Sequence, residues 1–322
     1  MTIFLDEKCV ASLVTMDDAL EAVEEVFREQ SNGNVLNVPR VRAPIKDGVL
    51  RITAGVIAYR GYYGIKVTSS AVFGKSAGRL FYLYREESGE LCAIMQVFAL
   101  STMRTGAASG IATKYLANPE AELLGVLGAG RQAKTQVEAV AKVRALREIR
   151  VFSPTTEHRR QFCDDIERSF EIKAIAVDTP AQAVVESDII IAATTSRNPV
   201  VRGEWLAPGT HINAIGANFE SRRELDSAAV AAANFIVTDD LEQARYESTD
   251  LIEPVKEGVL AWDRVHGISD VVGGRLRGRA SPSDITLFKS LGIAPEDVAF
   301  GARVYERALE RKAGVMLPDL AG

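Results

Sequence analysis

Residues 123–133 have the sequence LLGVLGAGRQA, and this stretch decides the fold. An apolar run leads into two closely spaced glycines and then into a helix, an arrangement that binds the pyrophosphate of a dinucleotide. Gly128 permits the tight turn, Gly130 lets the backbone approach the phosphate, and Ala133 is small enough for close packing of helix on strand. The free N–H groups of the first helical turn then face the anion. The stretch therefore predicts a strand, a phosphate-binding turn and a helix.

Strands and helices alternate after the glycine turn. Short apolar runs indicate strands, and helices are expected to begin near Gln132, Glu157 and Pro180. This alternation predicts an α/β fold with a parallel, doubly wound sheet and helices on both of its faces. The expected strands cover residues 123–127, 149–152, 172–176, 189–192, 211–214 and 235–237.

The first hundred residues have a different texture. Thr15 is suited to cap a first helix, and Asp18 follows three residues later as in a capping box. From about residue 38 to residue 98, short β-rich runs separated by turns predict an antiparallel or mixed sheet. Small residues at 102–115 indicate a closely packed helix, and residues 284–313 are predicted to be an amphipathic helical tail that returns to this first domain.

Composition excludes several classes of function. The net charge is −5 and no dense block of lysine and arginine occurs, so nucleic acid is not expected as a partner. No apolar run approaches 18 residues and the N-terminus is too polar for a signal peptide, so neither a membrane span nor secretion is expected. Three separated cysteines and three histidines match no metal spacing, which predicts no metal site and reduced thiols in a cytoplasmic protein.

The end of the second expected strand bears on the choice of dinucleotide. NAD-specific enzymes usually have an Asp or Glu there, against the ribose 2′-hydroxyl. This chain has Ser153 and Thr155, followed by His158 and Arg159, so no carboxylate repels a 2′-phosphate and an arginine is near. NADP is therefore the favoured cofactor and NAD the alternative. The same residues also fit a turn and helix cap that simply lacks an acid.

Four cations of the sheet region are candidates for holding a substrate carboxylate: Arg40, Arg42, Arg51 and Lys66. Alternation along residues 62–68 predicts that Lys66 points away from the apolar side, as a solvated surface lysine would. Periodicity alone therefore does not distinguish these residues from surface cations. In the later segment RRELD, Glu224 and Asp226 are expected to cap the next helix rather than to act as bases.

Four ordered motifs together resemble the ornithine cyclodeaminase/mu-crystallin family. They are Arg104-Thr105 with the small residues that follow, GAGRQA at 128–133, NAIGANFESRRELD at 213–226, and TLFKSLGIAPEDVA at 286–299. The resemblance extends from the first helix to about Tyr305. It implies a substrate-binding and dimerisation domain at 1–115 plus 290–322, a Rossmann domain at 116–289, and an active site in the cleft, where substrate carboxylate meets nicotinamide. A homodimer is therefore expected.

The resemblance also implies roles for individual residues. Arg40, Lys66 and Arg104 match positions that bind the substrate carboxylate, and Ser153 and Thr155 match positions around the adenosine ribose, with Arg159 nearby. The residues that match cofactor-contacting positions are Arg104, Thr105, Gly128, Ala129, Gly130, Arg131, Gln132, Thr194, Thr195, Ile215 and Ser290.

Two departures from the cyclodeaminase pattern bear on the reaction. Asn218 stands where cyclodeaminases have an aspartate that shuttles protons, and Leu50 stands where their pattern has an acid. Cyclodeamination needs proton transfers at two nitrogens, whereas reduction of a preformed imine needs an anchored carboxylate, a hydride and one proton. We therefore expect an NAD(P)H-dependent imino-acid reductase, with Lys66 and Asn218 at the reaction centre. The alternatives are an ornithine cyclodeaminase and an NADPH-binding protein without efficient turnover.

Overall fold

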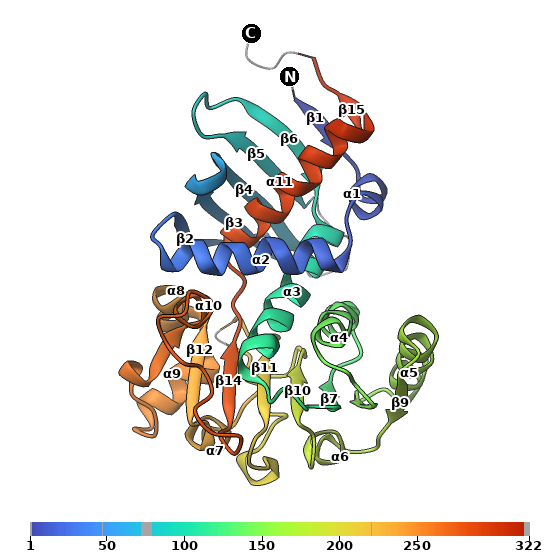
Figure 1. Ribbon diagram of the computed structural model, residues 1–322, viewed down its shortest axis with the longest axis vertical. Helices are drawn as coiled ribbons and strands as arrows, with labels where there is room; N and C mark the ends of the chain where they lie inside the picture. Colours follow the sequence, from blue (N-terminus) through green and yellow to red (C-terminus); the bar gives the residue numbers. More distant parts are fainter. Residues whose placement is uncertain (1, 47, 72–78, 220, 319–322) are drawn as a thin grey trace. The chain divides into compact units, whose positions relative to one another are not determined.

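Two β-sheets organise the structure, which is a computed structural model that describes residues 2–46, 48–71, 79–219 and 221–318 (Figure 1). Each sheet belongs to its own compact unit: unit 1 comprises Met1–Arg104 and Gly292–Gly322, and unit 2 comprises Thr105–Leu291. The first boundary lies inside helix α3 (Phe98–Leu116), eleven residues before the expected one at 115/116. An unbroken helix has no linker composition, so the sequence contains no local signal for this boundary.

Unit 1 has a mixed seven-stranded sheet in the order β15-β1-β6-β5-β4-β3-β2. Strand β1 runs parallel to β6, and the other neighbouring pairs are antiparallel, which confirms the expected mixed sheet. The strands are β1 (Ile3–Leu5), β2 (Val35–Ile45), β3 (Gly48–Ile57), β4 (Tyr62–Ala71), β5 (Leu80–Arg85), β6 (Leu91–Gln96) and β15 (Val315–Met316). The helices are α1 (Glu7–Leu13), α2 (Met16–Ser31), the short η1 (Ala58–Arg60), α11 (Ala294–Arg311) and the start of α3.

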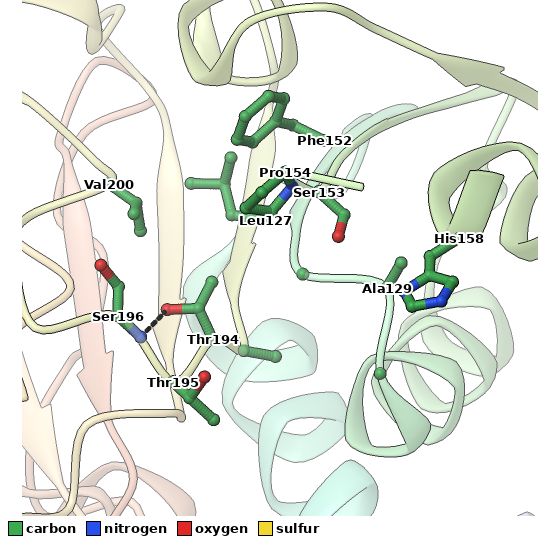
Figure 2. A pocket seen from close by; sticks show the side chains of 13 residues that line it. Leu127, Ala129, Phe152, Ser153, Pro154, His158, Thr194, Thr195, Ser196 and Val200 are labelled. Atoms are coloured by element: carbon green, nitrogen blue, oxygen red, sulfur yellow. Dashed lines mark hydrogen bonds between the residues drawn. The ribbon is translucent and has the colours of Figure 1, made fainter. Parts of the chain in front are cut away.

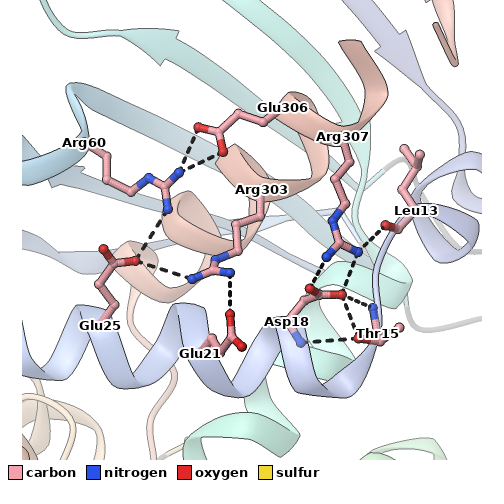
Figure 3. A network of polar contacts seen from close by, with 9 residues as sticks. All are labelled: Leu13, Thr15, Asp18, Glu21, Glu25, Arg60, Arg303, Glu306 and Arg307. Carbon is pink, nitrogen blue, oxygen red and sulfur yellow. Dashed lines mark hydrogen bonds and ion pairs between the residues drawn. The ribbon is translucent and has the colours of Figure 1, made fainter. Parts of the chain in front are cut away.

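Helices α2 and α11 are joined by a polar network (Figure 3). The expected capping box is present: the Thr15 hydroxyl accepts a hydrogen bond from the Asp18 backbone, and the Asp18 carboxylate accepts one from the Thr15 backbone. The same carboxylate forms an ion pair with Arg307 of α11. One aspartate therefore fixes both the start of α2 and its contact with α11.

Helix α11 packs closely on β3 and β4 because glycines leave room for it. A Cβ at Gly55 would lie 2.8 Å from a side-chain carbon of Pro295 in α11. Gly64 leaves room instead for the Phe81 ring of β5, which would lie 2.5 Å from a Cβ there, and a Cβ at Gly301 of α11 would lie 2.6 Å from the same ring. Lys66 lies on the same covered face as Gly64, and only 8% of it is exposed. The prediction of a solvated Lys66 is therefore wrong. Alternation correctly grouped the residues that share each face of β4. It assigned the wrong face to the interior, because the half-exposed face is the one with Tyr63, Ile65 and Val67.

Unit 2 contains a parallel eight-stranded sheet in the order β13-β12-β14-β11-β10-β7-β8-β9. The order in which the chain adds strands reverses between β7 and β10: β8 and β9 lie on one side of this point, and β10 and β11 lie on the other. This is the expected doubly wound fold. The strands are β7 (Leu123–Leu127), β8 (Glu148–Phe152), β9 (Lys173–Ala176), β10 (Ile189–Ala192), β11 (His211–Ala214), β12 (Phe235–Thr238), β13 (Val265–Gly267) and β14 (Thr286–Lys289). The helices are α4 (Arg131–Val143), α5 (Thr156–Phe170), α6 (Pro180–Val184), α7 (Ser227–Ala232), α8 (Leu241–Glu247), α9 (Thr249–Lys256) and α10 (Ile268–Val272), with short η2 (Gly203–Trp205) and η3 (Trp262–Arg264).

Both faces of this sheet are buried under helices. Along β10, Ile189 and Ile191 belong to one apolar core, whereas Ile190 and Ala192 belong to another. Successive strand residues point to opposite faces, so the two cores lie on opposite sides of the sheet. The strand is apolar throughout for this reason.

One predicted element is wrong. Residues 284–313 were expected to form one helical tail, but β14 occupies Thr286–Lys289, inside the sheet, and α11 begins only at Ala294. The polar ends of β14 are both fully buried: Thr286 hydrogen-bonds His211, and Lys289 forms an ion pair with Asp250. The partners that make burial of these polar residues possible lie far away in sequence. The sequence of the strand by itself therefore looks like that of an amphipathic segment with an exposed polar side.

Within the described ranges, no helix combines the length and the apolar character that crossing a membrane requires.

Candidate functional site

A cavity of about 380 Å³ lies in unit 2 at the carboxyl ends of β7, β8 and β10 (Figure 2). This is the edge where doubly wound sheets bind ligands. The residues that line the cavity are Leu127, Gly128, Ala129, Gly130, Phe152, Ser153, Pro154, His158, Ala193, Thr194, Thr195, Ser196 and Val200.

The glycine turn shapes the part of this cavity nearest to helix α4. Gly128 has φ +106°, and a Cβ there would lie 2.5 Å from the carbonyl oxygen of Ala193. At Gly130 a Cβ would meet open space, and the residue caps α4 without any side-chain hydrogen bond to the helix. Ala133 is fully buried. Open space in front of an uncapped helix N-terminus suits a pyrophosphate, so these residues fit a dinucleotide.

The end of the cavity next to β8 is lined by Ser153, Pro154 and His158, and among the described residues that line the cavity none is an aspartate or a glutamate. Arg159 does not line it. Its guanidinium donates to the Ser153 carbonyl oxygen at 3.1 Å and forms an ion pair with Asp178. His158, one residue earlier on α5, faces the cavity instead.

Of the other residues expected to contact the cofactor, Thr194 and Thr195 line the cavity. Ile215 and Ser290 do not line the cavity. Ile215 is buried, and the Ser290 hydroxyl donates to Asp239. Asn218 is half-buried in the loop after β11. Four more residues that were expected to contact the cofactor do not line the cavity either: Thr105, Arg131, Gln132 and Thr155.

Glu224 and Asp226 have different roles in the structure. Asp226 is the N-cap of α7, as expected, and accepts a hydrogen bond from the Ala229 backbone at 2.7 Å. Glu224 does not cap the helix. It is fully buried, and burial raises the pKa of its carboxyl to about 7, against the opposing influence of Lys289. The expectation that Glu224 caps α7 is therefore wrong, and sequence spacing gave no sign of its burial.

Unit 1 contains a group of charges that we call the cation cluster: half-buried Arg40 and the buried Lys66, Arg104, Glu296 and Asp297. The Lys66 ammonium lies 2.5 Å from one Asp297 oxygen, and Arg104 Nε lies 3.1 Å from the other. Arg104 also pairs with Glu296 at 2.7 Å, and Arg40 donates to the carbonyl oxygen of Gly292 at 2.8 Å. The structure thus brings together the three residues predicted to bind a substrate carboxylate.

Electrostatics in the cation cluster follow from burial and close pairing. Burial lowers the pKa of Lys66 to about 8, with Arg104 and Arg40 acting in the same direction and Asp297 opposing them. The pKa of Asp297 is lowered in spite of its burial, because Arg104 and Lys66 stabilise the carboxylate. The cluster therefore holds an ammonium that can lose its proton near neutral pH beside a carboxylate that stays ionised.

Glu296 and Asp297 were missed as site residues, although they lie within the quoted motif TLFKSLGIAPEDVA. Acidic residues are common in the first turn of a helix, where they interact favourably with the helix dipole at the surface. The exposed fractions of Glu296 and Asp297, 0% and 1%, distinguish them from such residues, and burial is not visible in the motif.

The profile of the ornithine cyclodeaminase/mu-crystallin family matches residues 1–312. The chain belongs to this family. Alanine dehydrogenase of Archaeoglobus fulgidus is 36% identical over 322 residues, covering 97% of each chain. The predicted membership of this family is therefore confirmed.

Two solved structures of the family resemble this one over nearly the whole chain. Thermococcus litoralis Δ1-pyrroline-2-carboxylate reductase, in complex with NADH and L-proline, is 33% identical, with a TM-score of 0.94 and coverage of 98% of this chain and 100% of that one. An archaeal alanine dehydrogenase dimer with bound NAD is 35% identical, with a TM-score of 0.92 and coverage of 98% and 99%. The predicted fold is confirmed, and the prediction of an oxidoreductase acting on amino or imino acids agrees with these family members.

Proposed function

We propose that the protein is an NAD(P)H-dependent reductase that converts an imino acid into the corresponding L-amino acid. The substrate class comprises cyclic ketimines, such as Δ1-pyrroline-2-carboxylate and Δ1-piperideine-2-carboxylate, and open-chain imines. The activities named for the alanine dehydrogenase and pyrroline-2-carboxylate reductase relatives support this class.

The cation cluster is the observation that carries the proposal. Its three cations and two carboxylates leave one net positive charge when all five groups are ionised (3 − 2 = +1). One substrate carboxylate balances that charge. Hydrogen bonds between charged partners contribute about 1.5–3 kcal/mol each, so such a carboxylate is held firmly. An imine next to a carboxylate is then fixed beside Lys66.

Lys66 is the proposed proton donor. Its pKa of about 8 lies close to neutral pH, where a general acid works best. The imine nitrogen gains one proton and the adjacent carbon gains a hydride, which together give the amine. When bound, the reduced nicotinamide cofactor supplies the hydride. Asp297 holds the Lys66 ammonium in position. Lys66 binds the carboxylate together with Arg40 and Arg104 while it donates its proton to the adjacent imine nitrogen.

NADPH is the proposed cofactor and NADH the alternative. The described part of the cavity lining contains no acid that would repel a 2′-phosphate, and His158 and Ser153 lie on the side where we expect the adenosine. The two solved structures named above hold NADH and NAD, which supports the alternative.

The loop after β11 favours reduction over cyclodeamination. Asn218 cannot exchange protons near neutral pH, so it does not replace the aspartate that cyclodeaminases have at this point. Ring closure with loss of ammonia requires proton transfer at two nitrogens, whereas imine reduction requires one proton. Lys66 alone is sufficient for the simpler reaction.

Assay of the purified protein with Δ1-pyrroline-2-carboxylate tests the proposal. We expect loss of NADPH or NADH absorbance together with formation of L-proline. Conversion of L-ornithine into proline and ammonia without net change in cofactor would favour a cyclodeaminase instead. Tight NADPH binding without turnover, over a panel of ketimines and amino acids, would favour a binding protein.

We also propose a homodimer in the cytoplasm. One face of the unit 1 sheet has half-exposed or exposed apolar side chains in a single row across five strands: Val38, Ala54, Ile65, Tyr82 and Ile94. Apolar surface of this extent is typical of a protein interface. The family member that is an alanine dehydrogenase dimer supports this assembly. The three cysteines are free, which fits a reducing compartment.

A further inference from the structure

The Glu224 carboxylate accepts four hydrogen bonds from two separate loops of unit 2. One oxygen accepts from the Thr194 backbone at 2.6 Å and from the Thr194 hydroxyl at 2.8 Å. The other accepts from the backbone N–H groups of Gly216 at 2.6 Å and Ala217 at 3.1 Å. Thr194 follows strand β10, and Gly216 follows strand β11. One buried side chain therefore joins the loops at the carboxyl ends of two adjacent strands.

The two loops touch each other directly at Gly216. A Cβ at this position would lie 2.1 Å from the carbonyl oxygen of Thr194 and 2.6 Å from the Glu224 carboxylate. No side chain fits there, so the spacing of the loops depends on the glycine and on the carboxylate that bridges it. Thr194 lines the cavity, and Asn218 follows two residues after Gly216.

The backbone of Glu224 is itself held on both sides. Its N–H donates to Asp250 at 2.7 Å, and its carbonyl oxygen accepts from Val200 and Val201 at 2.8 Å and 2.9 Å. Asp250 is fixed by Lys289 of β14 at 2.9 Å, and both of these side chains are fully buried. Glu224 thus belongs to a buried network that begins at Lys289 in the middle of the sheet and ends at Thr194 of the cavity.

The position of the two loops indicates which half of a dinucleotide they serve. In a doubly wound sheet the two halves of the cofactor bind on either side of the point where the strand order reverses. That point lies between β7 and β10 here, and the β8 end bears Ser153 and His158. The adenosine therefore lies on the β8 side, and the nicotinamide half lies on the side of β10 and β11.

We propose that Glu224 is a positioning residue for the nicotinamide half of the cofactor, acting through Thr194 and through the loop that contains Asn218. The inference rests on the proposed cofactor, but not on the identity of the imino acid. A glutamine at this position offers one acceptor and one donor, so either the Thr194 N–H or the N–H pair of the other loop loses its acceptor. The loops then separate while the glycine turn and the adenosine side stay in place.

Calorimetric titration of the purified full chain tests this without any turnover. The probes are NADPH or NADH, whichever wild-type protein binds more tightly, and the matching ADP-ribose fragment, which lacks nicotinamide. For Glu224→Gln we expect the dissociation constant of the intact cofactor to rise about tenfold or more. That of the fragment should change less than about threefold. Glu224→Asp keeps the charge and one of the two loop contacts, so it should give an intermediate loss.

Glu148→Gln is the matched control. Glu148 is also a buried carboxylate of the parallel sheet, with partners Arg150 at 2.9 Å and Lys173 at 2.7 Å. It begins strand β8, whose other end lines the cavity. This variant should bind both probes as wild type does.

Each outcome decides the matter. Equal weakening of both probes in Glu224→Gln, or no weakening of either, overturns the inference. If that variant does not fold, Glu224→Asp carries the same comparison, and failure of both to fold assigns Glu224 a purely structural role. Wild-type protein that binds no nicotinamide cofactor overturns the proposed function itself, which is a distinct result.

Discussion

Lys66 and Asp297 are 231 residues apart in the chain and form a buried ion pair, with Nζ 2.5 Å from Oδ2. Gly55 lets helix α11 pack closely on the sheet, because a Cβ there would lie 2.8 Å from Pro295, and this packing brings the first turn of the helix next to β4. Breaking a buried pair by removing one partner leaves a charge without compensation, so each member of this pair is a sensitive position.

Lys66→Met should weaken imine binding selectively. Methionine is of similar length but has no charge, so a substrate carboxylate loses one charge-assisted contact of about 1.5–3 kcal/mol. The KM for the imine should rise about 10- to 150-fold or turnover should disappear, with little change in cofactor affinity. Lys46→Met, at an exposed lysine of the same unit, is the control and should behave as wild type. Unchanged kinetics in Lys66→Met would make Lys66 a purely structural cation.

Asp297→Asn should move the pH dependence of the reaction. Burial lowers the pKa of Lys66 to about 8 and Asp297 opposes this effect, so removal of the carboxylate lowers that pKa further. In wild-type protein the protonated fraction of Lys66 falls as pH rises through about 8, and kcat/KM should fall with it. In Asp297→Asn the decline should begin at lower pH.

The control for this profile is Glu306→Gln, which removes another ion-paired carboxylate of the same helix, 2.8 Å from Arg60. Its pH profile should match that of wild type. If Asp297→Asn showed an unshifted alkaline limb, the titrating group would be some residue other than Lys66.

Ser153→Asp should change the cofactor preference. Ser153 lines the cavity on the side proposed for the adenosine, and a carboxylate there would repel a 2′-phosphate and favour a ribose 2′-hydroxyl. The ratio of kcat/KM for NADPH to that for NADH should fall about tenfold or more. Ser153→Ala separates the charge from the loss of the hydroxyl and should shift the ratio much less. A constant ratio in Ser153→Asp would mean that a 2′-phosphate is held elsewhere.

The parallel sheet was largely predictable from the sequence, whereas the cation cluster was not. Apolar runs such as residues 189–192 identify buried strands because both of their faces are covered. Lys66 has the local pattern of a surface lysine, and only the packing of α11 buries it. Strand β14 was missed for a related reason, since the partner that neutralises buried Lys289 is Asp250, 39 residues earlier. A buried charge that is neutralised by a residue far away in the sequence leaves no periodic pattern in the residues around it.

Asp18→Asn should destabilise the fold in a pH-dependent way. Asp18 caps α2 and pairs with Arg307 (Figure 3), and its hydrogen bonds with Thr15 and Arg307 outweigh its burial, so its pKa is lowered. Loss of the charge should reduce the free energy of unfolding by about 1–3 kcal/mol at pH 7. A carboxyl with a lowered folded-state pKa stabilises the fold above its unfolded-state pKa of about 4, and this contribution disappears as pH falls through the folded-state value.

Urea unfolding at a series of pH values from neutral to acidic checks this prediction. The difference between wild type and Asp18→Asn should shrink as the solution becomes acidic. Glu21→Gln removes an exposed ion pair of the same helix, with Arg303 at 2.9 Å, and should cost less than about 1 kcal/mol. An equal cost for both variants would contradict the special role of Asp18.

Ile65→Lys should dissociate the proposed dimer. Ile65 lies in the middle of the apolar row between Ala54 and Tyr82, on the sheet face that α11 does not cover. A stable interface buries roughly 800 Å² per partner and has few charges at its centre, so a lysine there loses its hydration without gaining a partner. Sedimentation analysis should then give one chain mass of 34.9 kDa instead of twice that value.

The matched control for dissociation is Leu309→Lys, which places the same charge on α11 of the same unit, at a leucine that is 49% exposed. Exposed single apolar residues of this kind are common on monomer surfaces, so this variant should sediment as wild type does. Wild-type protein that sediments as a single chain, or Ile65→Lys that remains a dimer, would exclude this sheet face as the interface. Dissociation of Ile65→Lys alone would assign the uncovered face of the sheet to the second copy of the chain, because both variants add the same charge and differ only in position.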